Sequence, residues 1–149
     1  LSIFFPMSNI SFEKSLLGDY DKILKKVMDF EKYPEFMPGQ LKSVKILKTD
    51  NNEILTEETL FFQTVIKKTI VQQTLHKKSP SSLESKIISG PAKNTTVFVH
   101  FEESDGKTKV SVNIDLKLSL TMKILEPLIK KYYKSFFNSF LNRLVISTM

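Results

Sequence analysis

Residues 122–149, MKILEPLIKKYYKSFFNSFLNRLVISTM, decide the fold class of this chain. Apolar residues recur there in adjacent pairs every four positions. The pairs are Ile124-Leu125, Leu128-Ile129, Tyr132-Tyr133, Phe136-Phe137, Phe140-Leu141 and Leu144-Val145. This spacing predicts one long α-helix with a wide apolar face. Pro127 has no N–H to donate to the carbonyl of Lys123, so we expect the helix to kink or begin near Pro127.

The surface that covers this helix must come from the preceding part of the chain. No second helix of similar length is predicted, which argues against a coiled coil or a four-helix bundle. From Leu41 onward the apolar residues recur at every second position for about eighty residues, a period typical of β-strands. The predicted strands span 41–48, 53–63, 64–77, 83–89, 95–103 and 109–120. The last strand alternates without a break, so its apolar residues should face the helix: Val110, Val112, Ile114, Leu116 and Leu118.

The N-terminal part supplies one more strand and short helices. Residues 8–17 predict a first strand, and Asp19 is a candidate N-cap for a helix over 20–30. Residues 31–37 have room for one further turn of helix before Pro38-Gly39, with Tyr33, Phe36 and Met37 pointing inward. Residues 1–7 are expected to form an extension outside the fold, so that a single domain covers residues 8–149.

The order of these elements indicates the architecture. Hairpin-length turns join the strands, among them Ser104-Asp105-Gly106-Lys107, which has the composition of a tight β-turn. Strands joined in this way form an antiparallel sheet, and helices restricted to the two ends of the order define an α+β fold. We therefore predict a curved antiparallel sheet of about seven strands wrapped around the long C-terminal helix.

One segment of the sequence also resembles a known family. Residues 27–38 read VMDFEKYPEFMP, and this Tyr-Pro-x-Phe-hydrophobe-Pro turn is similar to one in coenzyme Q-binding proteins of the START-like (SRPBCC) superfamily. Glu126-Pro127, early in the last helix, is also similar to that family. The order of elements resembles its helix-grip fold, which includes polyketide cyclase/dehydrase-like proteins. The sequence departs from relatives that carry Trp-Cys after the second proline, because Gly39-Gln40 stands there. The resemblance implies a cavity for a hydrophobic small molecule between the last helix and the sheet.

The composition excludes several classes of chemistry. The chain has no cysteine, and its four glycines leave no nucleotide-binding fingerprint. We predict no catalytic residues, no metal site and no cofactor, and we expect a cytoplasmic location. The formal net charge is +6, and all the basic residues but Arg143 are lysines. This excess allows weak contact with an anionic membrane surface or a ribosome, whereas DNA binding is not expected.

Four polar residues of the strands are candidates for a role in a cavity. His76 adjoins Lys77-Lys78, so we expect it to be exposed. His100 faces either side of its strand, depending on the register, and is a functional candidate if it faces inward. Glu57 and Glu58 are adjacent, so one of them points to each face of its strand. For the inward one, exposure at a strand edge or pairing with Lys67 or Lys68 is the expected outcome.

Three functions remain open at this point. The first is binding or transport of a lipid, isoprenoid quinone or polyketide-like molecule, without catalysis. The second is a cyclase or dehydratase acting on such a ligand, which requires an acid/base pair inside the cavity. The third is interaction with a ribosome or RNA. Large rigid rings facing a curved sheet pack incompletely, so we expect a cavity. The predicted ligand-binding residues are Phe36, Met37, Tyr132, Phe136 and Phe140, with Tyr33 and His100 as weaker candidates. The turn around Phe36 and Met37 is expected to act as the gate of the cavity.

Overall fold

A computed structural model describes residues 8–63 and 67–149 and contains a seven-stranded antiparallel sheet. The strand order is β1-β7-β6-β5-β4-β3-β2, so consecutive strands from β2 to β7 are neighbours. The strands are β1 (Ser8–Leu17), β2 (Leu41–Asp50), β3 (Glu53–Gln63), β4 (Lys67–Ser79), β5 (Ser82–Ile87), β6 (Thr96–Ser104) and β7 (Lys107–Leu116). The predicted sheet is confirmed, although the strand expected over 64–77 includes residues 64–66, which lie outside the described residues.

Short helices connect the two edges of the sheet. After β1, the chain forms α1 (Tyr20–Val27), η1 (Phe30–Lys32) and α2 (Tyr33–Phe36), and then enters β2 at the opposite edge. Asp19 caps α1 as predicted, because its Oδ1 accepts a hydrogen bond of 3.1 Å from the backbone N–H of Lys22. The helix predicted over 20–30 ends at Val27, and Phe30 begins the separate turn η1.

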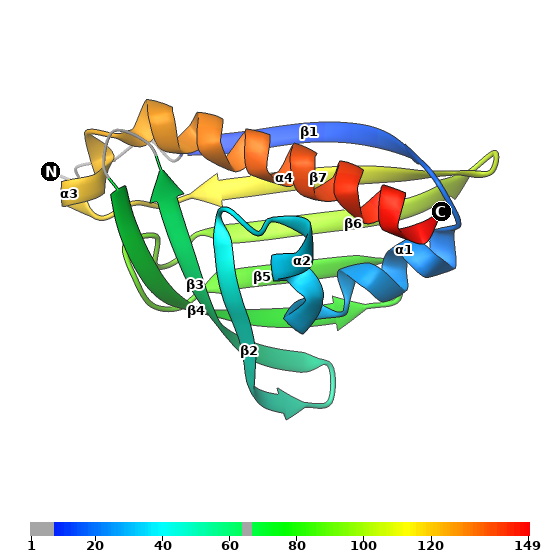
Figure 1. Ribbon diagram of the computed structural model, residues 1–149, viewed down its shortest axis with the longest axis horizontal. Helices are drawn as coiled ribbons and strands as arrows, with labels where there is room; N and C mark the ends of the chain where they lie inside the picture. The colour runs from blue at the N-terminus through cyan, green and yellow to red at the C-terminus, as the bar shows by residue number, and fades with distance from the viewer. Residues whose placement is uncertain (1–7, 64–66) are drawn as a thin grey trace, which may run out of the picture.

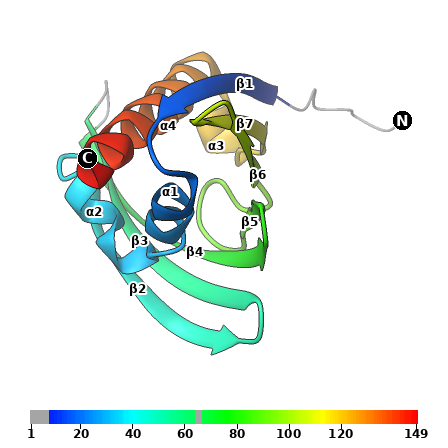
Figure 2. The same ribbon diagram turned by 90° about the vertical axis from the view of Figure 1, so that its right-hand side faces the viewer.

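The C-terminal part forms two helices with a break between them. α3 (Leu120–Lys123) precedes α4 (Glu126–Thr148), in which Pro127 occupies the first turn. This confirms that the long helix begins near Pro127, where the missing N–H costs no internal hydrogen bond. In Figure 1, α4 runs across the sheet, with α3 and α1 at opposite ends of the molecule. Figure 2 shows the sheet as an open curve from β1 to β2, with α4 and α2 between its two edges.

The core lies between α4 and the concave face of the sheet. Val110, Val112, Ile114 and Leu116 are all buried, which confirms the predicted inward face of β7. From α4, Leu144 is fully buried, together with Phe140, Leu141 and Val145. The wide apolar stripe of the helix therefore packs against the apolar faces of the strands, as the alternation requires.

The last predicted strand ends earlier than the sequence indicated. β7 stops at Leu116, Leu118 is only half-buried, and Leu120 is exposed. The Thr95 hydroxyl bonds both the N–H and the carbonyl of Lys117, at 2.9 and 3.0 Å, so the backbone leaves the ladder with β6 there. Leu118 and Leu120 continue the alternation beyond the end of β7, into the segment that leads to α3. Their spacing therefore does not mark the buried face of a strand.

The turns follow the predicted chemistry. Ser104 pairs with Lys107 across the β6–β7 turn, where Asp105 and Gly106 have φ values of 50° and 74°. Positive φ at both central residues is the geometry that matches the twist of a hairpin. Among the residues that the structure describes, no helix is long and apolar enough to cross a membrane.

The packing of α4 predicts a strong contrast between two leucine-sized residues of the same helix. Leu144→Ala removes a fully buried side chain and should lower the free energy of unfolding by about 2–5 kcal/mol. Ile146→Ala is the matched control, because Ile146 is 66% exposed, and it should change that free energy by less than about 0.5 kcal/mol. Urea denaturation measures both. Equal losses in the two variants would contradict the orientation of α4.

Candidate functional site: a cavity between α4 and the sheet

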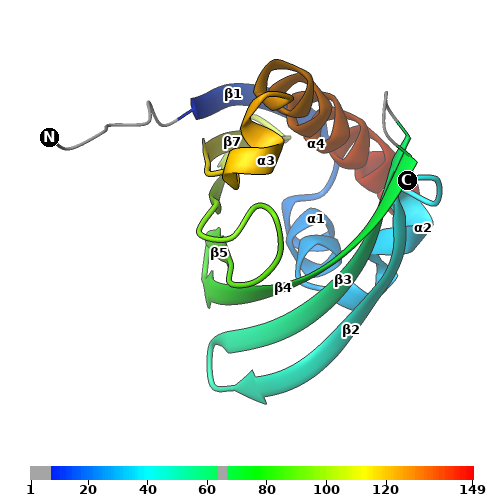
Figure 3. The ribbon, with the colours of Figure 1, turned by 90° about the vertical axis from the view of Figure 1, so that its left-hand side faces the viewer.

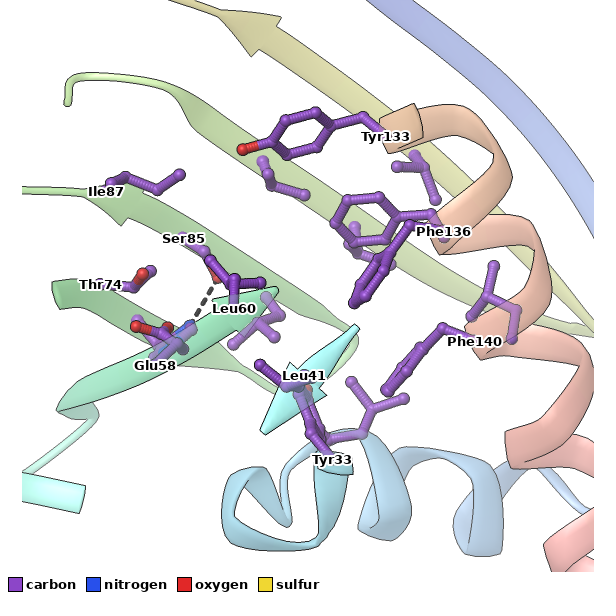
Figure 4. Close-up of a pocket in the computed structure, with 18 of the residues that line it drawn as sticks. Tyr33, Leu41, Glu58, Leu60, Thr74, Ser85, Ile87, Tyr133, Phe136 and Phe140 are labelled. Carbon is purple, nitrogen blue, oxygen red and sulfur yellow. Dashed lines mark hydrogen bonds and ion pairs between the residues drawn. The ribbon is translucent and has the colours of Figure 1, made fainter. Parts of the chain in front are cut away.

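A partly open cavity of about 150 Å³ lies between α4 and the concave face of the sheet. Strands β2 to β7 and helices α1, α2 and α4 all contribute to its wall. Figure 4 shows Tyr133, Phe136 and Phe140 entering from the helix, and Glu58, Thr74 and Ser85 from the strands opposite. The cavity therefore has an aromatic side, which is formed by the helix, and a side formed by the sheet that includes polar residues.

The aromatic side is a row of rings at helical spacing. Tyr132, Phe136 and Phe140 follow one another along α4, with ring centroids 6.0 and 6.3 Å apart and nearly parallel planes in the second pair. Tyr33 from α2 meets Phe140 edge to face at 4.7 Å. The structure thus places these four predicted residues on the cavity wall. Their role in binding stays a prediction.

Phe36 and Met37 do not lie on this wall. Phe36 is buried in the core, with its ring edge-on to Phe140 at 5.5 Å. Met37 is buried too, and lines a separate groove on the other side of Tyr132 and Phe136. The sole arginine, Arg143, donates a hydrogen bond of 2.9 Å to the carbonyl of Phe36. The turn expected to be a gate is therefore anchored to α4 by packing and by this bond.

His100 faces away from the cavity. In β6, Val97, Val99 and Phe101 are buried and line the cavity, whereas Phe98 is exposed and His100 is half-buried. Alternation along the strand places His100 on the convex face with Phe98. The register, which could not be read from the sequence, decides this orientation.

A row of polar side chains crosses three strands on the concave face. Thr56 of β3 lies opposite Thr74 of β4, and His76 of β4 lies opposite Ser85 of β5. Glu58 follows Thr56 two residues along the strand, so it faces the same side. Gln72 of β4 lies opposite Glu58 and faces the same side. The antiparallel register therefore gathers six polar residues from three strands, and five of them, all but Thr56, line the cavity.

His76 is held in place on all sides. Its Nε2 lies 2.8 Å from the Thr56 hydroxyl, and its Nδ1 lies 2.7 Å from the Ser85 hydroxyl. Figure 4 marks the contact made by the Ser85 hydroxyl with a dashed line. Its ring stacks on Phe30, with 4.2 Å between centroids. The expectation that His76 is exposed was wrong, because it is buried among these groups. Burial lowers the pKa of His76 to about 4, so the ring is neutral at pH 7.

Glu58 is the second buried ionisable group. Its Oε1 accepts a hydrogen bond of 2.9 Å from the Thr56 hydroxyl and lies 3.9 Å from His76 Nε2. Its Oε2 is buried and has no hydrogen-bond partner within the described residues. Burial raises the pKa of Glu58 to about 7, against the opposing effect of the Thr74 and Thr56 hydroxyls. The expected strand-edge exposure was wrong, and the neighbour of Lys68 across the ladder is Phe62, not Glu58.

The tyrosine hydroxyls of the wall differ in their partners. The Tyr33 hydroxyl donates to the carbonyl of Val27, and burial raises its pKa well above the usual range. The Tyr132 hydroxyl is buried without a hydrogen-bond partner in the part of the chain that the structure describes, and burial raises its pKa to about 12. Both groups therefore stay protonated at neutral pH.

The arrangement can donate and accept hydrogen bonds, but it does not resemble a metal centre. Across residues 8–63 and 67–149, no group of three or more His, Asp or Glu side chains could hold a metal ion. His76 has both ring nitrogens engaged, so it has none left for a ligand. The only sequence signal for the buried carboxyl of Glu58 was its adjacency to Glu57. That adjacency does not reveal which of the two residues faces inward.

A second hollow adjoins the cavity. Phe62 and Tyr132 line both spaces, and their rings lie 4.5 Å apart. The outer hollow measures about 200 Å³ and lies between the ends of β3 and β4 and the segment that contains α3. The Phe62–Tyr132 ring pair therefore lies between the cavity and this outer hollow. Figure 3 views the ribbon from the α3 end of the molecule.

Known structures share this architecture. The ZhuI aromatase/cyclase from Streptomyces sp. R1128 matches with a TM-score of 0.76 at 12% identity, over 93% of this chain and 94% of that chain. A START superfamily protein from Mycobacterium smegmatis matches with a TM-score of 0.75 at 18% identity, over 94% and 96%. Major latex-like protein 151 from Panax ginseng matches with a TM-score of 0.71 at 10% identity, over 96% and 98%. These likenesses confirm the START-like helix-grip fold.

Comparison at the level of sequence identifies the family. The search of curated proteins gave no match to this chain. The family model described as polyketide cyclase / dehydrase and lipid transport matches residues 21–145, from α1 to the last turns of α4. This match includes every strand from β2 to β7 and all the residues of the cavity wall. The chain therefore belongs to the polyketide cyclase/dehydrase and lipid transport family.

Proposed function

We propose that this protein binds or carries a hydrophobic small molecule, such as a lipid, an isoprenoid quinone or a polyketide-like compound, in the cavity beneath α4. The observation that supports this most directly is the wall itself, in which Tyr132, Phe136 and Phe140 face the apolar residues of a curved sheet across an unfilled space. Mostly apolar cavities with few polar groups are typical small-molecule sites.

The volume limits which part of a ligand is enclosed. A dry apolar cavity of about 150 Å³ in another protein holds a molecule of the size of benzene, and the cavity here is of the same size. The enclosed part is therefore one ring or a short branched chain. A longer ligand would displace the Phe62–Tyr132 ring pair and extend into the outer hollow of about 200 Å³.

Exposed apolar residues adjoin the lining of the outer hollow, since Leu120 precedes Thr121 and Ile124 precedes Leu125 in the chain. Leu120 and Ile124 are 75% and 86% exposed, and Leu128 is 44% exposed. Lys68 and Lys131 line the hollows on either side of Leu128. We call Leu120, Ile124 and Leu128 the apolar rim. Apolar side chains beside lysines favour an anionic membrane, because the side chains enter the interface while the ammonium groups meet the lipid phosphates.

A membrane fits the rim better than a ribosome or RNA does. Exposed Leu and Ile side chains gain nothing from a phosphate backbone, which is bound by charge. Anionic lipids are enriched in the cytoplasmic leaflet, so the proposed contact agrees with the cytoplasmic location expected from the sequence. A ligand taken from such a membrane would pass the outer hollow before it reaches the cavity.

A second candidate function is catalysis on the bound molecule by a cyclase or dehydratase. It is favoured by Glu58, a carboxyl in the cavity whose raised pKa of about 7 lets it give or take a proton near neutral pH. His76 lies 3.9 Å away, but both its nitrogens are engaged and its pKa is lowered by burial. The acid/base pair that catalysis requires is therefore only half available, and binding remains the better-supported function.

Substitution of a cavity ring tests the binding proposal. Phe136→Trp enlarges a side chain on the cavity wall, so it should weaken binding of p-xylene at least about fivefold while lowering the free energy of unfolding by less than about 1 kcal/mol. A filled core would instead show an overpacking loss of about 1–3 kcal/mol. Phe98→Trp on the convex face is the matched control and should change neither quantity. NMR titration and urea denaturation measure the two. A parent protein that binds no p-xylene and carries no ligand in native mass spectrometry would refute the proposal.

Charge reversal of the apolar rim tests the membrane contact. Ile124→Glu should reduce binding to vesicles rich in phosphatidylglycerol at least about tenfold, since it removes an apolar anchor and adds repulsion. Ile146→Glu, at the other end of α4 and 66% exposed, should leave vesicle binding within about twofold. Cosedimentation with vesicles provides the measurement. Unchanged binding of Ile124→Glu, or loss in both variants alike, would argue against the rim, and tight binding to polyuridine by the parent would favour the RNA alternative.

The ionisation of Glu58 predicts a pH-dependent difference in stability. Its pKa is about 7 in the folded state against an ordinary value of 4.5, so the folded state binds more protons between these pH values. The contribution of Glu58 to stability is therefore full below about pH 4.5 and is lost as the pH rises through 7. The free energy of unfolding of Glu58→Gln, relative to the parent, should rise by about 3 kcal/mol between about pH 4.5 and 8. Titration of His76 has the opposite sign, and it cancels because both proteins retain it.

Glu57→Gln is the control for this measurement. Glu57 has the same charge and a neighbouring position but faces the other side of β3. Its charge is the smallest of the effects on the pKa of Glu58, so the difference of Glu57→Gln from the parent should change with pH much less than that of Glu58→Gln. Urea denaturation over the pH range measures both variants. A flat difference for Glu58→Gln would show that Glu58 titrates normally, and it would remove the support for acid/base chemistry in the cavity.

A further inference from the structure

Three polar atoms of the cavity wall are buried without a partner in the described part of the protein. One is the Tyr132 hydroxyl on the helix side, and the other two, Glu58 Oε2 and Thr74 Oγ1, are on the sheet side. Glu58 and Thr74 are close enough for the hydroxyl to lower the pKa of the carboxyl, yet these two atoms make no hydrogen bond of normal geometry. Figure 4 shows their oxygens beside each other on the sheet side of the cavity. We call Glu58 and Thr74 the polar end of the cavity.

The neighbouring side chains of Thr56, His76 and Ser85 already make hydrogen bonds within the protein. Thr56 bonds Glu58 Oε1 at 2.9 Å and lies 2.8 Å from His76 Nε2, and Ser85 lies 2.7 Å from His76 Nδ1. Stacking on Phe30 keeps the imidazole from turning toward the polar end. Leaving a buried polar atom unpaired costs about 1–3 kcal/mol, so such atoms normally have a partner. Apart from each other, these two atoms have no partner among the described residues, so a further hydrogen bond to them comes from the contents of the cavity.

The two free atoms differ in what they can do. An ionised carboxylate only accepts hydrogen bonds, whereas a threonine hydroxyl both donates and accepts. A ligand hydroxyl donates to Glu58 Oε2 and accepts from Thr74 Oγ1, so one group satisfies both atoms. A carbonyl only accepts, so it can bond the Thr74 hydroxyl but pairs with Glu58 only when that carboxyl is protonated. An ammonium group would have to be desolvated among the aromatic rings, at a large cost in free energy.

We propose, building on the binding function above, that the polar end selects a ligand with a hydroxyl head group, an alcohol or a phenol. The hydroxyl enters first and lies between Glu58 and Thr74, and the apolar body lies against Phe136 and Phe140. The Phe62–Tyr132 ring pair is on the path of the remainder of the molecule toward the outer hollow. The ligand class thus follows from two unpaired oxygens at one end of a mostly apolar space.

The ionisable groups around Glu58 allow a pH test. They are His76 on β4, Tyr33 on α2, Tyr133 on α4 and the adjacent Glu57. Burial raises the pKa of both tyrosines above their usual range and lowers that of His76 to about 4. Glu58 is then the cavity group that titrates between about pH 6 and 8. A hydroxyl can bond both forms of Glu58, whereas a carbonyl loses the Glu58 donor above about pH 7.

The decisive experiment compares p-cresol, p-xylene and benzaldehyde, which have similar size and differ in the polar group. A purely apolar cavity prefers p-xylene, because the hydroxyl of p-cresol must leave water without a replacement hydrogen bond. The parent protein should instead bind p-cresol at least as tightly as p-xylene, with little change between about pH 6 and 8. Isothermal titration calorimetry gives the dissociation constants, and native mass spectrometry the stoichiometry.

Variants of the polar end should reverse this preference. Thr74→Val is nearly isosteric and should weaken p-cresol binding about three- to tenfold, without weakening that of p-xylene. Glu58→Leu should shift the ratio of the two dissociation constants toward p-xylene by about tenfold or more. Glu57→Leu, on the other face of the strand, should leave the ratio unchanged. Thr74→Val carries the test if Glu58→Leu does not fold.

Each other outcome has a defined meaning. If the parent binds neither p-cresol nor p-xylene, the binding function fails. If p-xylene binds more tightly than p-cresol in the parent and in all variants, the binding function stands and the hydroxyl proposal is overturned. A preference for p-cresol that survives Glu58→Leu and Thr74→Val also overturns it, since an ordered water then satisfies the polar end. Benzaldehyde that binds most tightly, and only below pH 7, would replace the hydroxyl with a carbonyl.

Discussion

Burial of the wide apolar face of α4 is the constraint on which the rest of the structure depends. The sheet is the one surface large enough to cover it, so the strands curve around the helix and present alternate residues to it. The contact is tightest at the C-terminal end, where Leu144 is fully buried. In the middle of the helix, from Tyr132 to Phe140, rings stand in place of Leu and Val. Rigid rings fill a concave surface less completely, and the cavity opens where they begin.

The polar residues beside this cavity leave one carboxyl oxygen without a hydrogen bond to the described part of the protein. Placing charged or polar groups among aromatic rings is unfavourable unless they bond one another. Thr56, His76 and Ser85 do so, and Phe30 holds the imidazole between them. Only one oxygen of Glu58 takes part in this chain. The other oxygen stays free beside Thr74, so the network is rigid at its centre and open at the end that faces the cavity.

The two ends of the molecule differ in how firmly they are held. At the α1 end, Asp19 caps a helix, Tyr33 donates to Val27, and Arg143 ties α2 to α4. At the α3 end, the helix is interrupted before Pro127, and apolar side chains are exposed. Few buried contacts and an interrupted helix are features of segments that open easily. Access to the cavity is therefore more consistent with the α3 end than with the Tyr33–Met37 turn.

The fold class and most of the long helix α4 could be predicted from the amino-acid pattern alone. Apolar residues recur every four positions in α4 and every two positions in β7. Each period identifies the buried face of its element without reference to any other element. The aromatic wall at Tyr132, Phe136 and Phe140 followed from the same spacing. Pro127 and Asp19 marked helix starts for local reasons, because a missing N–H and a side-chain cap act within one turn.

The pairing of the strands in the folded protein was needed to know that Glu58 faces the cavity, and which faces of the sheet His76 and His100 occupy. Glu57 and Glu58 are equivalent in the sequence, and so are the two faces open to His100. Which side of a strand is inward depends on its pairing with its neighbours, since a shift of one residue exchanges the faces. The pairing of β3 with β4 and of β4 with β5 brings Glu58, Thr74, His76 and Ser85 together from a span of 28 residues. Burial, which sets their pKa values, exists only once the sheet has curved over the helix.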